Sequence, residues 1–579
     1  MGRFGRGVAC LVCAAVAVAG PCSDGWAFRD VYSDTWAATD ALGRELPGYE
    51  ECGPVREGRY VGVFYFLWLG GHGTGGPYDI TKLLAERPEN PTYGPQGAFH
   101  HWGEPEAGYY LSDSEYVIRR HARMLAEAGV DTLIFDVTNG FTYTATYMKL
   151  CGIYREMRQA GDYTPQVCFL THSNSAGVIK KLYDELYSKG LYEELWFRWK
   201  GKPLILGGAE GLDVKIREFF SVRDCWAWTH GKDTWSWLDH WPQQYAWHEA
   251  QDRAEEVSVS VAEHPTTNIG RSHSGVREPV HDKYGLTATT GDGIYFGKQW
   301  DKALDIDPEF VFITGWNEWV AQRFIAKNGQ GFLGEKLGEG QTFFVDQYNQ
   351  EYSRDIEPMK GGHGDNYYYQ MVAGIRRYKG VRQRVASGEA RTIRIDGDFS
   401  DWQGVKTEYR DWVGDTEHRK EKGWGSAGEY VDATGRNDFA VMKVAHDWRN
   451  VYFYVQTKEA ITRWDDPHWM MLFIDSDGEK ATGWEGYDYL INGEVADDET
   501  STLKRSVSGW DWNEKGRVKY KVKGNEMEIA VRRAAIGQER KVGFDFHWAD
   551  NIQKDGDIVE FAASGDSAPS RRFNYRYGE

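Results

Sequence analysis

Cysteine and proline are scarce in this chain, and the residue patterns that bind zinc or nucleotide phosphates are absent from it. Its 579 residues include 7 cysteines and 17 prolines. The wide spacing of the cysteines fits no zinc pattern, and it leaves one or two disulfides open. The sequence has no HExxH motif, and the run Gly70–Gly76 lacks the lysine and hydroxyl residue that complete a phosphate-binding loop.

Positive charge is also in short supply. The chain carries 68 Lys and Arg against 87 Asp and Glu, a formal net charge of −19. Binding phosphates requires clustered Lys and Arg, so this balance argues against nucleic acid or an anionic membrane as a partner. Aromatic residues, by contrast, make up 15% of the chain, with 25 Trp and 34 Tyr. So many rings predict exposed stacking surfaces in addition to a core.

An apolar run near the start is typical of a secretion signal. Arg3 and Arg6 precede the run Val8–Ala19, and small residues follow it. The run is too short for a membrane-spanning helix, which needs about 20 apolar residues. We therefore predict a signal peptide within residues 1–27 and a secreted, periplasmic or cell-surface protein. No other segment of the sequence is apolar enough to cross a bilayer.

Between residues 60 and 319, apolar strand-like segments alternate with amphipathic helical ones. The predicted strands are RYVGVFYFLW, VDTLIFDV, PQVCFLTH, KPLILGG, RDCWAWTH, EVSVSVAEHP, DGIYFG and EFVFITGW. Glu115–Ala128, Tyr147–Ala160 and Val178–Lys189 have helical spacing. Alternating strands and helices imply parallel pairing, and eight such units imply an α/β fold of the (β/α)8 TIM-barrel type. We assign residues 28–385 to this barrel and its closing helices.

The pattern changes after a linker at Val385–Ala390. Short alternating strands follow, separated by turn signals and without a long helix between them. This pattern predicts an antiparallel β-sandwich over residues 391–579.

The run VFITGWNEW, Val311–Trp319, carries the best catalytic candidate. Its apolar half predicts a buried strand, and Glu318 follows between two tryptophans. A poorly solvated carboxylate has a raised pKa, which suits a glycosidase acid or base, whereas a structural hydrogen-bonded Glu is the alternative. Glycoside hydrolysis usually takes a second carboxyl group. Asp136, at the end of the second predicted strand, is our candidate, with a loop-capping Asp as the alternative.

Polar and aromatic residues recur at the carboxyl ends of the predicted strands, where a TIM barrel has its active face. We predict the following as substrate-binding residues: Trp68, His101, Trp102, His172, Trp228, His264, Arg271, Tyr295, Trp316, Asn317 and Trp319. Loops are polar in any case, so each residue alone is a weak signal. Asp346, Glu351 and Glu357 lie in the following region, and we expect them to be structural. No cofactor is expected to be required for catalysis.

In the predicted sandwich, Asp475, Asp477 and Gly478 form a turn rich in oxygen ligands. Such ligands suit calcium, and a plain Asp-Gly turn is the alternative. We therefore expect a structural calcium there, bound by Asp475 and Asp477, as one of two interpretations.

The barrel region, with GWNEW at its last strand and DIEP downstream, resembles the glycoside hydrolase family 99 and WbsX-like group. The resemblance implies a (β/α)8 fold, action on polysaccharides with mannoside as the family substrate, and a catalytic role for Glu318. It also implies a second Glu three residues further on, where this chain has Ala321. A second carboxyl must therefore come from elsewhere, or the protein does not hydrolyse.

Three segments of the C-terminal region resemble family 9 carbohydrate-binding modules. They are IDGDFSDW (Ile395–Trp402), DWRNVYFYV (Asp447–Val455) and FIDSDG (Phe473–Gly478). The resemblance implies paired tryptophans that grip glycan, and often calcium. Related sandwiches bind haem through Met and His, which makes a haem redox protein a further alternative.

Together these features predict a secreted glycoside hydrolase that cleaves a polysaccharide or glycan, with Glu318 as acid/base. The alternative is a non-catalytic glycan-binding protein with a degenerate barrel. In both cases the partner is a glycan.

Overall fold

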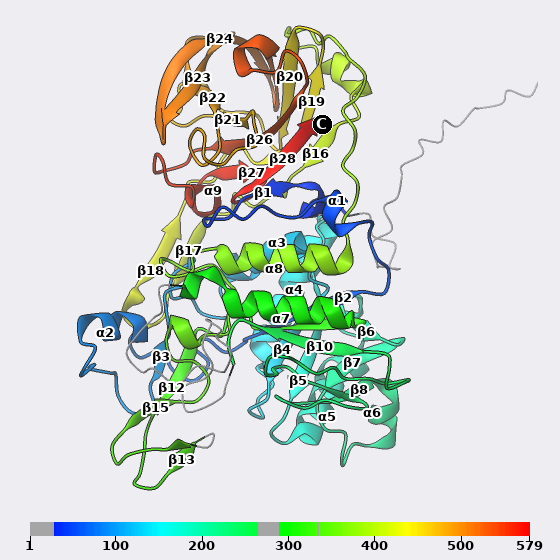
Figure 1. Ribbon diagram of the computed structural model, residues 1–579, viewed down its shortest axis with the longest axis vertical. Coiled ribbons are helices and arrows are strands. Elements are labelled where there is room, and N and C mark those ends of the chain that lie inside the picture. Colours follow the sequence, from blue (N-terminus) through cyan, green and yellow to red (C-terminus); the bar gives the residue numbers. More distant parts are fainter. Residues whose placement is uncertain (1–27, 264–288, 333–334, 579) are drawn as a thin grey trace, which may run out of the picture.

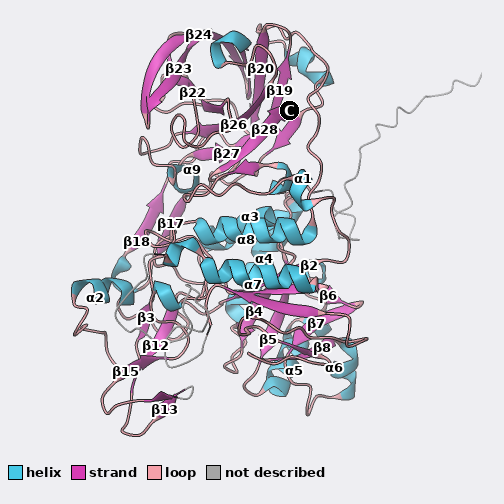
Figure 2. Cartoon of the chain, in the orientation of Figure 1, coloured by secondary structure: helices cyan, strands magenta, loops and turns pink. Residues whose placement is uncertain are grey.

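The computed structural model describes residues 28–263, 289–332 and 335–578. Figure 1 shows two stacked bodies, and Figure 2 shows that helices gather in the lower body whereas the upper body consists mostly of strands. None of the helices in these ranges combines the length and the apolarity that crossing a bilayer requires. Cys52, Cys151, Cys168 and Cys225 are free thiols.

The lower body is built on a parallel sheet that nearly closes into a barrel. Its strand order is β10-β11-β2-β4-β5-β7-β8-β9, and β6 pairs with β7 at the side. The bounds are β2 (Tyr60–Tyr65), β4 (Thr132–Val137), β5 (Gln166–Thr171), β6 (Arg198–Trp199), β7 (Lys202–Leu206), β8 (Ser221–Cys225), β9 (Thr234–Trp235), β10 (Glu256–Ser260) and β11 (Phe310–Thr314). All residues of β4, β10 and β11 are buried, as expected for parallel strands covered on both faces.

Seven of the eight predicted strands are present, and one prediction was wrong. The segment DGIYFG, residues 292–297, runs into helix α7 (Ile294–Ile306) instead. Tyr295, Phe296, Gln299, Trp300 and Ala303 of α7 are buried, a spacing that follows one helix face. The eighth strand is the two-residue β9, which the sequence analysis missed.

The predicted helices of the barrel are present. Helix α3 (Glu115–Ala128) has the predicted bounds, with the Ser114 side chain accepting from Val117 N at its start and Gly129 in the left-handed region at its end. The other helices are α1 (Tyr49–Cys52), α2 (Ile80–Glu86), α4 (Thr144–Gln159), α5 (Ser175–Glu185), α6 (Val214–Phe219), α8 (Asn366–Lys379) and α9 (Glu560–Ala563).

A small antiparallel sheet extends from the end of the barrel strands. Its order is β15-β12-β3, and its strands are β3 (Phe99–His101), β12 (Val320–Ile325) and β15 (Thr342–Phe344). A separate hairpin joins β13 (Gly331–Phe332) and β14 (Glu335–Lys336). Because β12 begins directly after the GWNEW run, this sheet is attached to the carboxyl end of β11.

The upper body is one antiparallel sheet of 12 strands, consistent with the predicted sandwich. Its order is β1-β28-β26-β21-β22-β23-β24-β25-β20-β19-β16, and β27 pairs with β26. The bounds are β1 (Ala37–Ala38), β16 (Glu408–Arg410), β19 (Phe439–His446), β20 (Asn450–Thr457), β21 (Met471–Asp475), β22 (Tyr489–Val495), β23 (Thr500–Ser508), β24 (Asp511–Lys523), β25 (Glu526–Arg532), β26 (Gly543–Asp550), β27 (Asp566–Ala568) and β28 (Phe573–Gly578). Strand β1 precedes the barrel in the sequence, so both ends of the described chain contribute to this sheet.

A hairpin reaches from the upper body to the lower one. It joins β17 (Arg419–Lys422) and β18 (Glu429–Asp432), and we call residues 419–432 the arm. Figure 1 shows the arm in yellow, running down beside the barrel. The Glu421 carboxylate accepts from Glu115 N at the start of α3 at 2.8 Å, and Trp424 N donates to the Tyr109 carbonyl at 2.7 Å. The two bodies are therefore joined by specific hydrogen bonds.

Candidate active site

Glu318 lies just beyond the carboxyl end of β11, and its backbone is fixed on both sides. Its N–H donates to Asp355 Oδ1 at 2.8 Å, and its carbonyl accepts from Trp102 Nε1 at 3.0 Å. The residue is 7% exposed. These two hydrogen bonds fix the backbone from which the buried side chain extends.

The Glu318 carboxylate has one cationic partner. Arg354 Nη2 donates to Oε2 at 3.0 Å, and the guanidinium lies 5.3 Å from the centroid of the Trp237 ring. Burial raises the pKa of Glu318 well above its usual range, and Arg354 offsets only part of that rise. Repulsion from further carboxylates raises the pKa as well, and these belong to Asp346, Asp355 and Asp136. Glu318 is therefore suited to carry a proton at neutral pH.

Asp136 ends β4, and three donors hold its carboxylate. Trp68 Nε1 donates at 3.1 Å, Thr138 N at 3.0 Å and Thr138 Oγ1 at 2.8 Å. Burial raises the pKa of Asp136, while these hydrogen bonds favour the ionised form and oppose the rise. Strands β11 and β4 flank β2 in the sheet, and Asp136 contributes to the raised pKa of Glu318. The two predicted catalytic carboxyls thus share one electrostatic environment.

Asp346 joins this environment from a different direction. It follows β15, is partly exposed, and its backbone carbonyl accepts from Arg354 Nη1 at 2.8 Å. Burial raises its pKa, and repulsion from Asp136 adds to the rise. We call Glu318, Asp136 and Asp346 the barrel-end carboxylates. The sequence analysis expected Asp346 to be structural, because nothing in the sequence shows that its loop returns to Glu318.

The neighbouring acidic residues Glu351 and Glu357 are buried and engaged in hydrogen bonds. Glu357 accepts from Tyr110 Oη at 2.6 Å and from Trp319 Nε1 at 2.5 Å, and Glu351 accepts from Thr290 Oγ1. These contacts make both carboxylates part of the packing around the site.

Three of the tryptophans predicted to bind substrate lie in the interior. Trp102, Trp316 and Trp319 are all 0% exposed, so none offers a ring face to a sugar. Trp102 and Trp319 stack on each other with centroids 4.3 Å apart, and Trp316 packs edge-on against His121. These indoles support the loop that carries Glu318, because they fill the space behind it.

Asn317, His101 and Tyr295 are also interior residues rather than substrate ligands. The Asn317 amide bridges the backbone of Phe66, accepting from its N–H at 2.8 Å and donating to its carbonyl at 3.2 Å. His101 is 1% exposed beneath the arm, and burial lowers its pKa to about 3. Tyr295 lies on α7, where its hydroxyl accepts from Gln299 Nε2 at 2.8 Å. Asn317 thus ties β2 to the GWNEW run.

Three further predicted residues, His172, Trp68 and Trp228, present rings at the surface. His172 is exposed and stacks on Trp226 at 3.6 Å, and Trp226 contacts Trp237, the ring that faces Arg354. Trp68 is partly exposed, and so is Trp228. A series of aromatic rings therefore leads from the surface at β5 and β8 to the partner of Glu318. His264 and Arg271 lie outside the described residues.

The position three residues after Glu318 cannot supply a carboxyl. Ala321 lies on β12, is 3% exposed, and packs in an apolar cluster with Ile80, Phe344 and Tyr348. The carboxylates that act electrostatically on Glu318 are instead those of Asp346, Asp355 and Asp136.

The predicted calcium ligands lie together in the upper body. Asp475, Asp477 and Asp488 each offer a carboxylate oxygen, and these oxygens lie within 4.8 Å of one another. Asp475 Oδ1 already accepts from Gly478 N at 2.7 Å, as in an Asp turn. The oxygen set fits a hard cation such as calcium, and the ion itself stays a prediction.

No protein-family model and no curated protein matches this chain. Two solved structures of the GH99 endo-alpha-mannosidase from Bacteroides thetaiotaomicron are similar to it, one of them in complex with bis-tris-propane. The first has a TM-score of 0.35 and 15% identity, and covers 56% of this chain and 98% of its own. The second has a TM-score of 0.32 and 14% identity, and covers 55% and 97%. Similarity at this level carries no inference about activity or substrate.

Proposed function

We propose that the protein is a glycoside hydrolase that cleaves a polysaccharide or glycan, with Glu318 as the acid/base. The observation that carries the proposal is the pairing of two carboxyl groups in different environments at one end of the barrel. Burial raises the pKa of both groups, that of Glu318 well above its usual range, whereas at Asp136 three hydrogen bonds that favour the ionised form oppose the rise. Environments that push two carboxyl pKa values apart are the requirement for glycosidic bond cleavage.

The roles follow from the protonation states. Protonated Glu318 donates its proton to the leaving glycosidic oxygen, and ionised Asp136 attacks the anomeric carbon or activates a water. Once Glu318 has lost its proton, the Arg354 guanidinium at 3.0 Å stabilises the new carboxylate until it is protonated again. Arg354 is therefore a positioning residue that acts through Glu318.

The surface rings supply the binding contacts of this proposal. Trp68 and Trp228 are partly exposed, and His172 is exposed and supported by Trp226. Flat rings bind the apolar faces of sugar residues by stacking. The acidic chain, with its net charge of −19, favours a neutral glycan over a polyanionic one. We also propose that the protein is secreted, and that the upper body binds glycan or braces the barrel.

One observation favours a second candidate, a non-catalytic glycan-binding protein. The position where the related family has its second Glu holds Ala321, which is packed in an apolar cluster. In this alternative the surface rings bind glycan and the barrel-end carboxylates only hold the fold together.

Product release from a glycan panel separates the two candidates. We expect the wild type to release sugar, and Glu318→Gln and Asp136→Asn to bind the same glycan without releasing product. Glu210→Gln is the matched control, because Glu210 follows β7 and is exposed. Full activity of Glu318→Gln contradicts the acid/base role of Glu318. Binding with no release by the wild type supports the glycan-binding alternative.

A further inference from the structure

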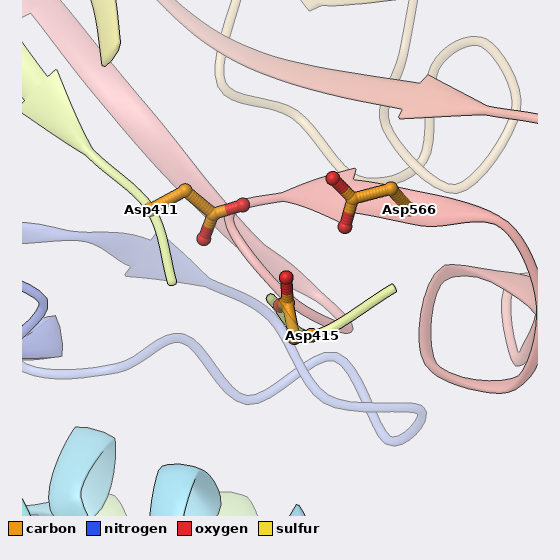
Figure 3. A group of neighbouring side chains, drawn as sticks. All are labelled: Asp411, Asp415 and Asp566. Carbon is orange, nitrogen blue, oxygen red and sulfur yellow. The ribbon is translucent and has the colours of Figure 1, made fainter. Parts of the chain in front are cut away.

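A second group of three aspartates lies between the two bodies. Asp411 and Asp415 belong to the segment between β16 and β17, and Asp566 begins β27. Each offers a carboxylate oxygen, and these oxygens lie within 4.8 Å of one another. Figure 3 shows the three carboxylates directed toward a common centre. We call them the interface carboxylates.

These carboxylates have few partners. Asp411 is 0% exposed, and neither of its oxygens has a hydrogen-bond donor; one oxygen of Asp415 also lacks a donor. Within the described ranges, no Lys, Arg or His forms an ion pair with any of the three. A buried, ionised carboxylate without a donor destabilises the fold unless a proton or a cation neutralises it.

The charged groups around the cluster offset it only in part. Arg123 of α3 attracts the Asp415 carboxylate, but its guanidinium also donates to Glu417 at 2.6 Å and to the Gly414 carbonyl at 3.0 Å. Asp438, a further acidic neighbour, is paired with Lys458 at 3.7 Å. Burial raises the pKa of Asp411 well above its usual range, and repulsion from Asp415, Asp566 and Glu127 of α3 adds to the rise. Ionising all three interface carboxylates therefore requires a further positive charge at the site.

Asp566 is held in place for binding. Its Oδ2 accepts from Phe439 N at 2.6 Å and its Oδ1 from Ser567 N at 2.9 Å, so the strand fixes the direction of the carboxylate. A small cavity of about 90 Å³ lies beside it, lined by residues of both bodies that include Asp415 and Arg123. The cavity has room for an ion and a few water molecules.

We propose that Asp411, Asp415 and Asp566 bind one calcium ion at the junction of the two bodies. Calcium takes six to eight oxygen ligands in a flexible geometry, and three carboxylates with waters or carbonyls supply such a set. This site is distinct from Asp475 and Asp477, and it does not depend on the proposed glycosidase activity. The ion offsets the charge that Arg123 leaves uncompensated.

The position of the site gives the ion a structural role. Trp412, next to Asp411, is 0% exposed, and its Nε1 donates to Glu127 Oε1 of α3 at 2.7 Å. The same segment continues directly into the arm. Calcium therefore fixes the segment that anchors the upper body on α3 and starts the arm.

The full-length protein, stripped with EDTA and dialysed, tests the site by metal analysis and thermal unfolding. We expect excess calcium to raise the melting temperature of the wild type by about 5 °C, a shift typical of saturating a specific site. Magnesium should give a smaller shift, because it requires near-octahedral geometry and dehydrates reluctantly. Bound calcium in Asp411→Asn should fall by one ion per chain, and its calcium-dependent shift should disappear.

The variants also distinguish calcium binding by Asp411 from a purely structural role of its side chain. In EDTA, Asp411→Asn should melt at or above the wild-type temperature, because one uncompensated charge is gone. Asp477→Asn is the matched control and should keep the shift. The proposal is overturned if the wild type binds no calcium, if magnesium stabilises equally, or if Asp411→Asn keeps the shift. Should Asp411→Asn fold poorly, the more accessible Asp415→Asn carries the same expectations.

Discussion

The barrel-end carboxylates and the interface carboxylates are two clusters of three acids, compensated in different ways. Arg354 donates to Glu318 at 3.0 Å and to the Asp346 backbone, so the first cluster has its own cation. In the second cluster, no ion pair reaches Asp411, and its oxygens lack donors. Carboxylates therefore have two different roles in this molecule. The acids beside Arg354 can exchange protons, whereas the acids without an ion-pair partner require a bound cation.

The largest expected effect concerns the first cluster. Glu318→Gln should lower kcat/KM roughly 100- to 10,000-fold, the usual contribution of a general acid. In the wild type, the rate should fall as the pH rises through the raised pKa of Glu318, because ionised Glu318 has no proton to donate. It should also fall at low pH as Asp136 becomes protonated. Rate profiles over pH 4 to 9, with roughly unit spacing, check both limbs.

The prediction is contradicted if Glu318→Gln reacts at the wild-type rate and its rate falls at low and at high pH as in the wild type. An unchanged melting temperature in the variant confirms that lost activity does not reflect unfolding.

Removing Arg354 should leave the first cluster without an ion-pair partner, as in the second cluster. Arg354→Met leaves Glu318 without its charged partner, and we expect the free energy of unfolding at pH 8 to fall by about 3–5 kcal/mol. The loss should be smaller at pH 5, where Glu318 is protonated, and smaller in the double variant with Glu318→Gln. Urea unfolding at both pH values measures these differences.

Lys360→Met is the control for this prediction. Lys360 pairs with Glu104 at 2.8 Å, but its side chain is 53% exposed. Its loss should cost at most about 1 kcal/mol. Equal losses in the two variants would contradict the role assigned to Arg354.

Asp355, which accepts from Glu318 N beside the first cluster, should make the free energy of unfolding depend on pH. Burial raises the pKa of Asp355 from its ordinary value of 3.8 to about 7, so between these two pH values the folded state holds a proton that the unfolded state has released. Stability from this group is thus present at low pH and is lost as the pH rises toward 7. Asp355→Asn should remove about 1.4 kcal/mol per pH unit of that slope between pH 5 and 6. Urea unfolding at several pH values measures this slope. The prediction is contradicted if the free energy of unfolding changes with pH equally in the wild type and in Asp355→Asn.

The barrel was predictable because its strands are continuous apolar runs bounded by turns, as at VDTLIFDV. The segment DGIYFG shows where this reasoning stops. Six residues containing Ile294 and Phe296 fit a strand, and only the wider spacing through Trp300 and Ala303 reveals the helix face. Strand β9 is two residues long, which is too short for any periodicity.

The candidate site was predictable only in part. Glu318 and Asp136 stand at strand ends, and parallel strands bring their ends to one edge. Arg354 and Asp346 reach them through the β12 and β15 sheet, whose pairing depends on contacts distant in sequence. The tryptophans beside Glu318 were placed wrongly, because a residue after a strand has no period that separates interior from surface.

The smallest expected effect compares two buried tryptophans that join the bodies. Trp412 Nε1 donates to the Glu127 carboxylate at 2.7 Å, whereas Trp424 Nε1 donates to the Gly75 carbonyl at 2.9 Å. Replacing either tryptophan by Phe removes one hydrogen bond and a similar side-chain volume. Because a hydrogen bond to a charged group is the stronger, Trp412→Phe should lower the free energy of unfolding by about 1 kcal/mol more than Trp424→Phe at pH 8. Burial raises the pKa of Glu127 to about 7, so this difference should shrink at pH 6, where the carboxyl is protonated. Urea unfolding of both variants at the two pH values measures it, and a difference independent of pH would contradict a charged acceptor.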